Sequence, residues 1–212
     1  MSVLLLCNAF RKLRIDSFEF IYVEPERYQS IETSRLLDKR KFSLSSVAPG
    51  FSAVPGNVMI LSKRRVKHKG VFFLGYEESR LRRAFEEVPV IQPQLTSVVF
   101  GVPAYRPGWE MDSFANNVTV IREKHIQGGV SYCGADNPLA AFEMLSQIKM
   151  SLQSNERMFV APLGTKPHGI GAALFSAKHD GIGVMYDHPV RKKERSDQVA
   201  FWHLFRVSGF CG

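Results

Sequence analysis

The feature that most constrains the fold of this chain is a repeated pattern of an apolar run followed by residues at helical spacing. In one unit, the apolar run 70–75 ends in glycine and precedes Leu81, Ala84 and Phe85, which lie at i, i+3 and i+4. A second apolar run, 97–102, is closed by a proline. Such runs are typical of buried strands, and the spacing that follows the first run is typical of an amphipathic helix.

A third unit strengthens this pattern. The run 158–161 leads through a Gly-Thr-Lys-Pro turn into residues at helical spacing from Ile170 onward. Before it, Asn137 and Pro138 suit the N-cap and first position of another helix. Strands that alternate with helices favour a mainly parallel sheet with right-handed crossovers. The sequence therefore predicts one Rossmann-like α/β domain over residues 1–212, with helices on both faces of the sheet.

Other segments complete the predicted organisation. Residues 18–23, 181–186 and 199–207 are expected to be strands, and the apolar start of the segment 1–16 is expected to be a strand or a truncated first strand. Two stretches rich in glycine, proline or serine, 43–57 and 105–113, are expected to be irregular.

The charge is unevenly distributed. The chain has 28 Lys and Arg against 20 Asp and Glu, a formal net charge of +8, which favours anionic partners such as nucleotides or nucleic acid. Each basic cluster is either a solvated surface or a binding site for phosphates, and charge alone does not separate these alternatives. The clusters are Lys63, Arg64, Arg65, Lys67 and Lys69; Arg80, Arg82 and Arg83; and Arg191, Lys192, Lys193 and Arg195.

The sequence gives no support for a metal or a cofactor. The three cysteines, Cys7, Cys133 and Cys211, form neither a disulfide framework nor a zinc pattern, and no histidine pair has ligand spacing. A phosphate-binding loop of the Walker type and a G-x-G-x-x-G fingerprint are also absent. No apolar run approaches the roughly 20 residues of a membrane-spanning helix. We therefore expect a cytoplasmic protein without cofactor, metal or membrane contact.

The turn 164–168 is the strongest candidate site, because ligands of open α/β sheets bind where a strand gives way to a helix. Gly164 allows close approach of the backbone, Thr165 can cap the helix, and Lys166 adds a positive charge where backbone N–H groups already favour an anion. A lysine at this position opposes the helix dipole, and a bound phosphate would resolve that conflict. His168 is a weaker candidate, because a lone histidine usually caps or packs.

Residues 161–171 resemble the Gly-Thr-Lys turn of CARF domains, the Rossmann-like sensors of cyclic oligonucleotides in prokaryotic antiviral effectors. The resemblance implies a ligand-sensing domain that works in antiviral defence. It also implies a second ligand-contacting turn after an earlier strand.

Two further turns could supply supporting contacts. Gly75, Ser79 and Arg80 follow the first strand, although ordinary helix-start chemistry explains the same residues. Tyr105 and Arg106 follow the second strand and suit stacking on a base or contact with a protein.

Three hypotheses follow from these residues. The first is a non-enzymatic module that binds a nucleotide-like or phosphorylated ligand and acts on a protein partner or a second copy. The second is an enzyme that cleaves a phosphate ester or nucleotide, in which Lys166 stabilises charge and His168 moves a proton. The third is a basic scaffold that binds nucleic acid or a protein through Lys63, Arg64, Arg65, Lys67 and Lys69.

Overall fold

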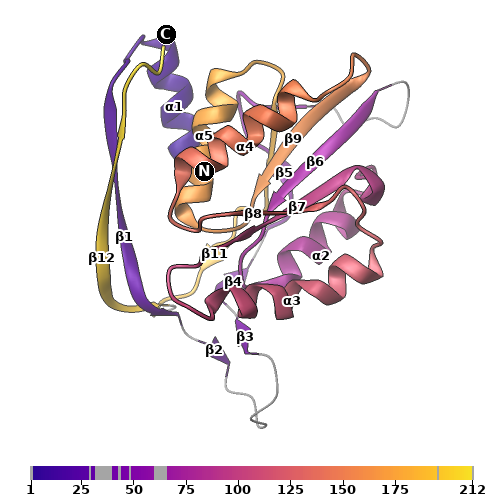
Figure 1. Cartoon of the computed structure of the whole chain (residues 1–212), viewed down its shortest axis with the longest axis vertical. Helices are drawn as coiled ribbons and strands as arrows, with labels where there is room; N and C mark the ends of the chain where they lie inside the picture. The colour runs from indigo at the N-terminus through magenta and orange to yellow at the C-terminus, as the bar shows by residue number, and fades with distance from the viewer. Residues whose placement is uncertain are drawn as a thin grey trace.

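A six-stranded sheet forms the centre of the molecule (Figure 1). The computed structural model describes residues 2–28, 30–31, 40–42, 44–47, 49–59, 66–194 and 196–211. Five parallel strands make up most of the sheet, namely β6 (Lys67–Phe73), β7 (Thr96–Gly101), β8 (Val130–Cys133), β9 (Glu156–Pro162) and β10 (Gly183–Tyr186). A short edge strand, β5 (Ser52–Ala53), pairs antiparallel with β10.

The strand order is β5-β10-β9-β6-β7-β8. The chain therefore starts the parallel sheet in its middle, adds β7 and β8 on one side of β6, and then returns to add β9 and β10 on the other. This order is that of the Rossmann-like α/β fold. The predicted fold class is confirmed.

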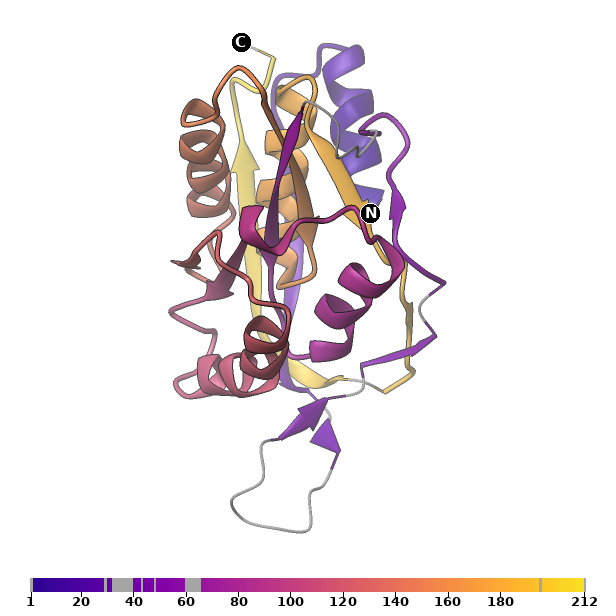
Figure 2. The same ribbon diagram turned by 90° about the vertical axis from the view of Figure 1, so that its right-hand side faces the viewer.

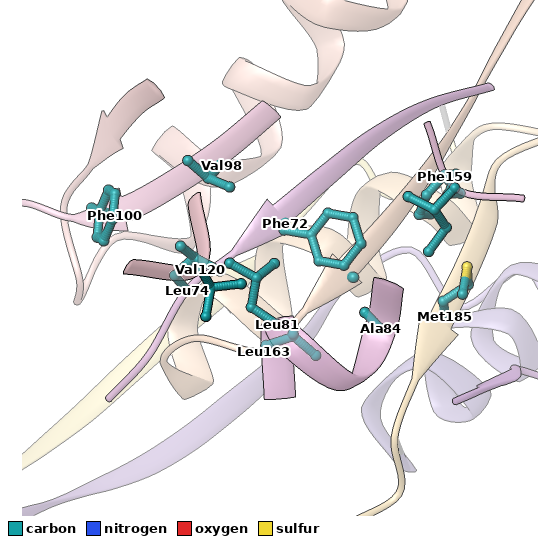
Figure 3. Close-up of a cluster of buried hydrophobic side chains, with 12 residues drawn as sticks. Phe72, Leu74, Leu81, Ala84, Val98, Phe100, Val120, Phe159, Leu163 and Met185 are labelled. Carbon is teal, nitrogen blue, oxygen red and sulfur yellow. The ribbon is translucent and has the colours of Figure 1, made fainter. Parts of the chain in front are cut away.

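Helices cover both faces of the sheet. Helices α2 (Glu78–Glu87) and α3 (Trp109–Glu123) lie on one face, while α4 (Pro138–Met150) and α5 (Lys166–Lys178) lie on the other (Figure 1). Alternate residues of β6 enter the two cores: Phe72 packs with Leu81 of α2 (Figure 3), whereas Phe73 packs with Phe175 of α5. The strand is apolar on both sides because it is buried on both sides.

A third layer lies outside α5. Helix α1 (Ser2–Lys12) packs on α5 through Leu4 and Cys7, which are fully buried. Beside these helices runs a long two-stranded antiparallel ribbon made of β1 (Phe18–Tyr28) and β12 (Ser196–Val207), seen at the left of Figure 1 and behind the sheet in Figure 2. Segments from the two ends of the chain thus form one structural unit.

Shorter elements connect these layers. They are β2 (Ser30–Ile31) paired with β3 (Lys41–Phe42), β4 (Ser45–Val47) paired with β11 (Val190–Arg191), and the 3-10 turn η1 (Pro93–Leu95). Part of the segment 43–57, expected to be irregular, is therefore strand. No helix within the described ranges combines the length and apolar character needed to cross a membrane.

The structure corrects the prediction of a strand within residues 1–16. Residues 2–12 are helical, because Leu4 and Cys7, three residues apart, form one face that packs on α5. An apolar run of this length does not by itself distinguish a helix from a strand. The apparent first strand is a helix of the outer layer.

Among the parallel strands and the helices that cover them, two elements were missed. Helix α3 begins at Trp109, inside the stretch expected to be irregular, and its buried face contains Ser113, Asn116 and Asn117. These polar residues hide the apolar period on which the prediction depended. Strand β8 was also missed, because it alternates between exposed and partly buried residues until Cys133.

Candidate functional site

The order of the strands reverses between β6 and β9, and the predicted site lies at this point. Strand β6 leads into α2 on one face of the sheet, and β9 leads into α5 on the other face. The two connections therefore leave the carboxyl ends of the strands toward opposite faces of the sheet. In open α/β sheets, this is the position where ligands bind.

The turns that follow β6 and β9 touch each other through their backbones. A Cβ added to Gly75 would lie 3.1 Å from the carbonyl oxygen of Leu163. A Cβ added to Gly164 would lie 2.9 Å from the carbonyl oxygen of Leu74. Both glycines are therefore required by the packing of one turn against the other, in addition to any approach by a ligand.

Helix α3 holds the first of these turns in place. Ser113 Oγ donates to the carbonyl oxygen of Gly75 at 3.0 Å, and Asn117 Nδ2 donates to the same oxygen at 2.8 Å. The two side chains lie one helical turn apart on the buried face of α3. Sequence reasoning missed their role, because polar residues at i and i+4 are also the ordinary pattern of a solvent-exposed helix face.

The second turn is fixed by the cap of α5. Thr165 Oγ1 accepts from the backbone N–H of His168 at 3.3 Å, which confirms the predicted N-cap. The same hydroxyl donates to the carbonyl oxygen of Ala135 at 2.6 Å and so joins this turn to the segment after β8. Lys166, the first helical residue, is exposed, and its charge lies at the positive end of the helix dipole.

His168 lies beneath the turns and is completely buried. Its Nε2 lies 2.9 Å from the carbonyl oxygen of Gly134 and 3.3 Å from that of Cys133, so this nitrogen carries the proton and donates. Burial lowers the pKa of His168 to about 4, which keeps the ring neutral at physiological pH. These contacts give His168 a structural role and argue against the transfer of protons to a ligand.

A cavity of about 380 Å³ opens beside the two turns. Its walls come from the ends of β6, β7 and β9, the start of α3, the start of α5 and the β1–β12 ribbon. Six of the predicted ligand-binding residues line it, namely Gly75, Arg80, Tyr105, Gly164, Thr165 and Lys166. Ser79, Arg106 and His168 are not among the described residues that line this cavity.

Aromatic side chains form one part of the cavity wall. Tyr76 and Trp109 meet edge to face with ring centroids 6.2 Å apart, and Tyr28 lies 5.7 Å from each of them. Burial raises the pKa of Tyr76 and of Tyr105, so both hydroxyls stay protonated at neutral pH. This wall can contact a flat apolar group and also donate hydrogen bonds.

Arg80 is held by a buried ion pair. Its Nε and Nη2 donate to the carboxylate of Asp187 at 2.7 and 2.6 Å, and its Nη1 donates to the carbonyl oxygen of Leu163 at 2.7 Å. The guanidinium therefore links α2, the turn after β9 and the end of β10. Contact with a ligand at this position stays a prediction.

Arg106 and Ser79 lie outside the cavity lining. The Arg106 guanidinium lies 5.6 Å from the centroid of the Trp109 ring and 4.0 Å from the carboxylate of Glu26. Ser79 is exposed in the first turn of α2. Arg106 thus contacts the cavity through Trp109, whose ring it faces.

Glu77 is a buried acid in the cavity wall. Its Oε1 accepts from the backbone N–H groups of Leu44 and Ser45 at 2.8 and 3.0 Å, and Arg191 Nη1 lies 3.6 Å from Oε2. Through these hydrogen bonds, the carboxylate of Glu77 holds β4 against the start of α2. The same donors also offset the repulsion between this acid and a phosphate.

Several of the described residues of the basic clusters are engaged in ion pairs. Beside the pair of Arg80, Arg82 contacts Glu123 at 2.6 Å and Arg83 contacts Glu87 at 2.5 Å. Lys69 lies 3.0 Å from Glu156, while Lys67 is exposed at the start of β6, the end of the strand farthest from the cavity. Lys63, Arg64, Arg65 and Arg195 lie outside the described residues.

Within the described residues, no group of three His, Cys, Asp or Glu side chains converges in a way that could hold a metal ion. Comparison with models of known protein families and with curated proteins found no match. The class of protein is therefore defined by the fold: a Rossmann-like α/β domain with a cavity at the point where the strand order reverses.

Proposed function

We propose that this protein is a ligand-sensing module that binds a nucleotide-like or phosphorylated molecule in the cavity at the carboxyl ends of β6 and β9. The observation that supports this most is the position of the cavity, at the carboxyl ends of the two strands where the strand order reverses. In this proposal the domain reports binding to a protein partner, and the CARF-like turn 161–171 suggests a role in prokaryotic antiviral defence.

The two sides of the cavity suit the two halves of such a ligand. Lys166 and the N-terminus of α5 provide positive potential for a phosphate. Tyr76, Tyr105 and Trp109 provide apolar surface for a base. A cavity of about 380 Å³ lies in the range of small-molecule sites, which is about 300–1,000 Å³.

Hydrolysis of the ligand has weaker support. The enzyme hypothesis assigned proton transfer to His168, and that ring is buried, neutral and bound to backbone carbonyl groups. The proposed function is therefore binding without chemical change.

A thermal-denaturation screen with mononucleotides, dinucleotides and cyclic oligonucleotides tests the proposal, with analysis of each nucleotide after incubation. A ligand at 100 times its dissociation constant stabilises the native state by about 2.7 kcal/mol. For a domain of this size, that corresponds to a rise of about 5–10 °C in the midpoint of unfolding. If no phosphorylated compound raises the midpoint, the proposal is wrong, and cleavage of a bound nucleotide would favour the enzyme instead.

Two variants locate the site. Gly169 lines the cavity, and a Cβ at this position would meet no atom within 4 Å, so Gly169→Leu should fill the cavity and abolish the rise without unfolding the domain. Lys166→Ala should reduce the rise by removing the charge beside the phosphate. Arg122→Ala removes an exposed positive charge in the last turn of α3 and should leave the rise unchanged.

The nucleic-acid hypothesis predicts a different result for the same protein. Binding of DNA or RNA through the segment that contains Lys67 would fall steeply with salt and would not respond to Gly169→Leu. Titrations at two salt concentrations with the wild type and with Gly169→Leu therefore separate a basic scaffold from a cavity ligand.

A further inference from the structure

The β1–β12 ribbon has two faces of different character. Its inner face packs on the body through aromatic residues: Phe18 lies 4.7 Å from Phe10 of α1 and 5.2 Å from Phe210, ring centroid to ring centroid. No residue that the structure describes covers its outer face, and the centre of that face is apolar. Ile21 is paired with Leu204 in the register, and Val23 is paired with Trp202.

These side chains are large and far from buried. Trp202 is 71% exposed, Ile21 67%, Leu204 56% and Val23 37%, and Val199, one step further along β12, is 53% exposed. Together they form an exposed apolar patch, and the largest such patch on a typical monomer, about 300–600 Å², is often functional. A standard protein interface buries about 800 Å² on each partner, so an interface here must include the polar rim of this patch as well as its apolar centre.

A pair of opposite charges lies at each end of the apolar centre, and the acid and the base exchange strands between the two ends. At one end, Glu19 of β1 pairs with Arg206 of β12, with the Arg206 Nε 2.9 Å from the Glu19 Oε1. At the other end, Arg27 of β1 lies opposite Asp197 of β12 in the register, and both are exposed. The acid therefore lies on β1 at the first end and on β12 at the second.

This arrangement is complementary to itself. Consider two ribbons that face each other, related by a two-fold axis that lies between them and runs perpendicular to the strands at the level of Val23 and Trp202. This axis sets Glu19 of one copy against Arg27 of the other. The same axis sets Arg206 against Asp197, and Trp202 against its own counterpart. Each charge then meets the opposite charge, as an isologous interface requires.

From these two observations, we infer that the outer face of the β1–β12 ribbon is a dimer interface that binds a second copy of this chain. The ribbons pack face to face, with Val23, Trp202, Ile21 and Leu204 in the centre and the four charged residues at the rim. Val23 and Val199 also line the cavity, so the interface borders it, but the inference rests on the ribbon's surface and not on the ligand proposed for the cavity.

Sedimentation velocity over a concentration series tests the centre of the interface. We expect the wild type to be a dimer at micromolar concentration, and Trp202→Glu to raise the dissociation constant by about 30-fold or more, as loss of an interface hot spot does. Leu139→Glu is the matched control, because Leu139 is 62% exposed at the start of α4, away from the ribbon. A wild type that is monomeric at about 100 μM, or a dimer that Trp202→Glu leaves intact, would overturn the inference.

Charge swaps test the symmetry without breaking the pairs within one chain. Variant A combines Glu19→Arg with Arg206→Glu, and variant B combines Arg27→Glu with Asp197→Arg. Each variant alone sets like charges against each other across the axis and should weaken its own dimer by about tenfold or more. Mixed together, A and B restore every opposite pair and should form a heterodimer.

Fluorescence energy transfer between labelled A and labelled B measures this heterodimer, and thermal unfolding of each variant confirms that it is folded. Transfer that is stronger in the mixture than in either variant alone supports the two-fold arrangement. Equal transfer in all three samples contradicts it.

Discussion

The turns around the cavity and the β1–β12 ribbon are stabilised by different kinds of interaction. In the turns, polar groups are buried and bonded to one another, as in the ion pair of Arg80 with Asp187, and glycines allow backbones to touch. In the ribbon, the register of two strands and one aromatic face provide the stability, while the outer charges remain in solvent. Substitutions in the turns should therefore affect folding, whereas substitutions on the outer face of the ribbon should affect recognition.

The largest expected effect comes from the buried ion pair. Arg80→Ala leaves Asp187, which is fully buried, without its cation, and should lower the free energy of unfolding by about 3–5 kcal/mol. Chemical denaturation followed by circular dichroism measures this change. Asp187→Asn in the Arg80→Ala background should recover part of the loss, because it removes the unpaired charge. A loss below about 1 kcal/mol for Arg80→Ala would show that the turns do not depend on this pair.

The buried histidine makes the stability of the turns depend on pH. Burial lowers the pKa of His168 from 6.5 to about 4, so between these values the unfolded state binds more protons than the native state. Stability should therefore fall as the pH decreases through this window, by about 2 kcal/mol between pH 7 and pH 5 from this residue alone. Denaturation curves at several pH values measure the slope, and His168→Gln should flatten it. An identical slope in the variant would assign the pH dependence to other groups.

Two glycines of α5 give a matched test of close packing. A Cβ on Gly171 would lie 2.3 Å from the carbonyl oxygen of Pro138, where α4 crosses α5, so Gly171→Ala should destabilise the domain by about 1–3 kcal/mol. Gly169→Ala, two residues earlier in the helix, meets no atom within 4 Å and should be neutral or stabilise by about 0.5–1 kcal/mol. The midpoints of thermal unfolding rank the two variants. Equal midpoints would mean that α4 and α5 are less closely packed than described.

The smallest expected effect lies on the ribbon. Arg206 and Glu19 are 75% and 45% exposed, so Arg206→Ala should change the free energy of unfolding by less than about 1 kcal/mol. Denaturation of a sample dilute enough to be monomeric measures the effect. A loss as large as that of Arg80→Ala would remove the distinction between the two regions.

The parts of the fold that the sequence predicted are those with strong local signals. The strand that contains Phe72 is apolar on successive residues because it is buried on both faces, and the helix caps at Asn137 and Thr165 were read correctly because capping is local chemistry. The segment 1–16 was predicted wrongly, because a short apolar run fits a helix as well as a strand until its partner, α5, is known.

The candidate site shows a similar division. The turns at Gly75 and Gly164 were identified from their position after strands, and both turns line the cavity. The support from Ser113 and Asn117 was missed, because polar side chains on a buried helix face resemble a surface until their target carbonyl is known. Arg80 was expected at a ligand, and the structure pairs it with Asp187, 107 residues later in the chain.

Composition, periodicity and local turn chemistry were enough to establish the Rossmann-like class and the turn that caps α5, because these depend on neighbours within a few residues. Tertiary structure alone decided that both ends of the chain form one ribbon, that His168 is buried, and that the charges of β1 and β12 alternate along one exposed face. Contacts between residues far apart in sequence depend on how several elements pack at once, and no local pattern contains that information.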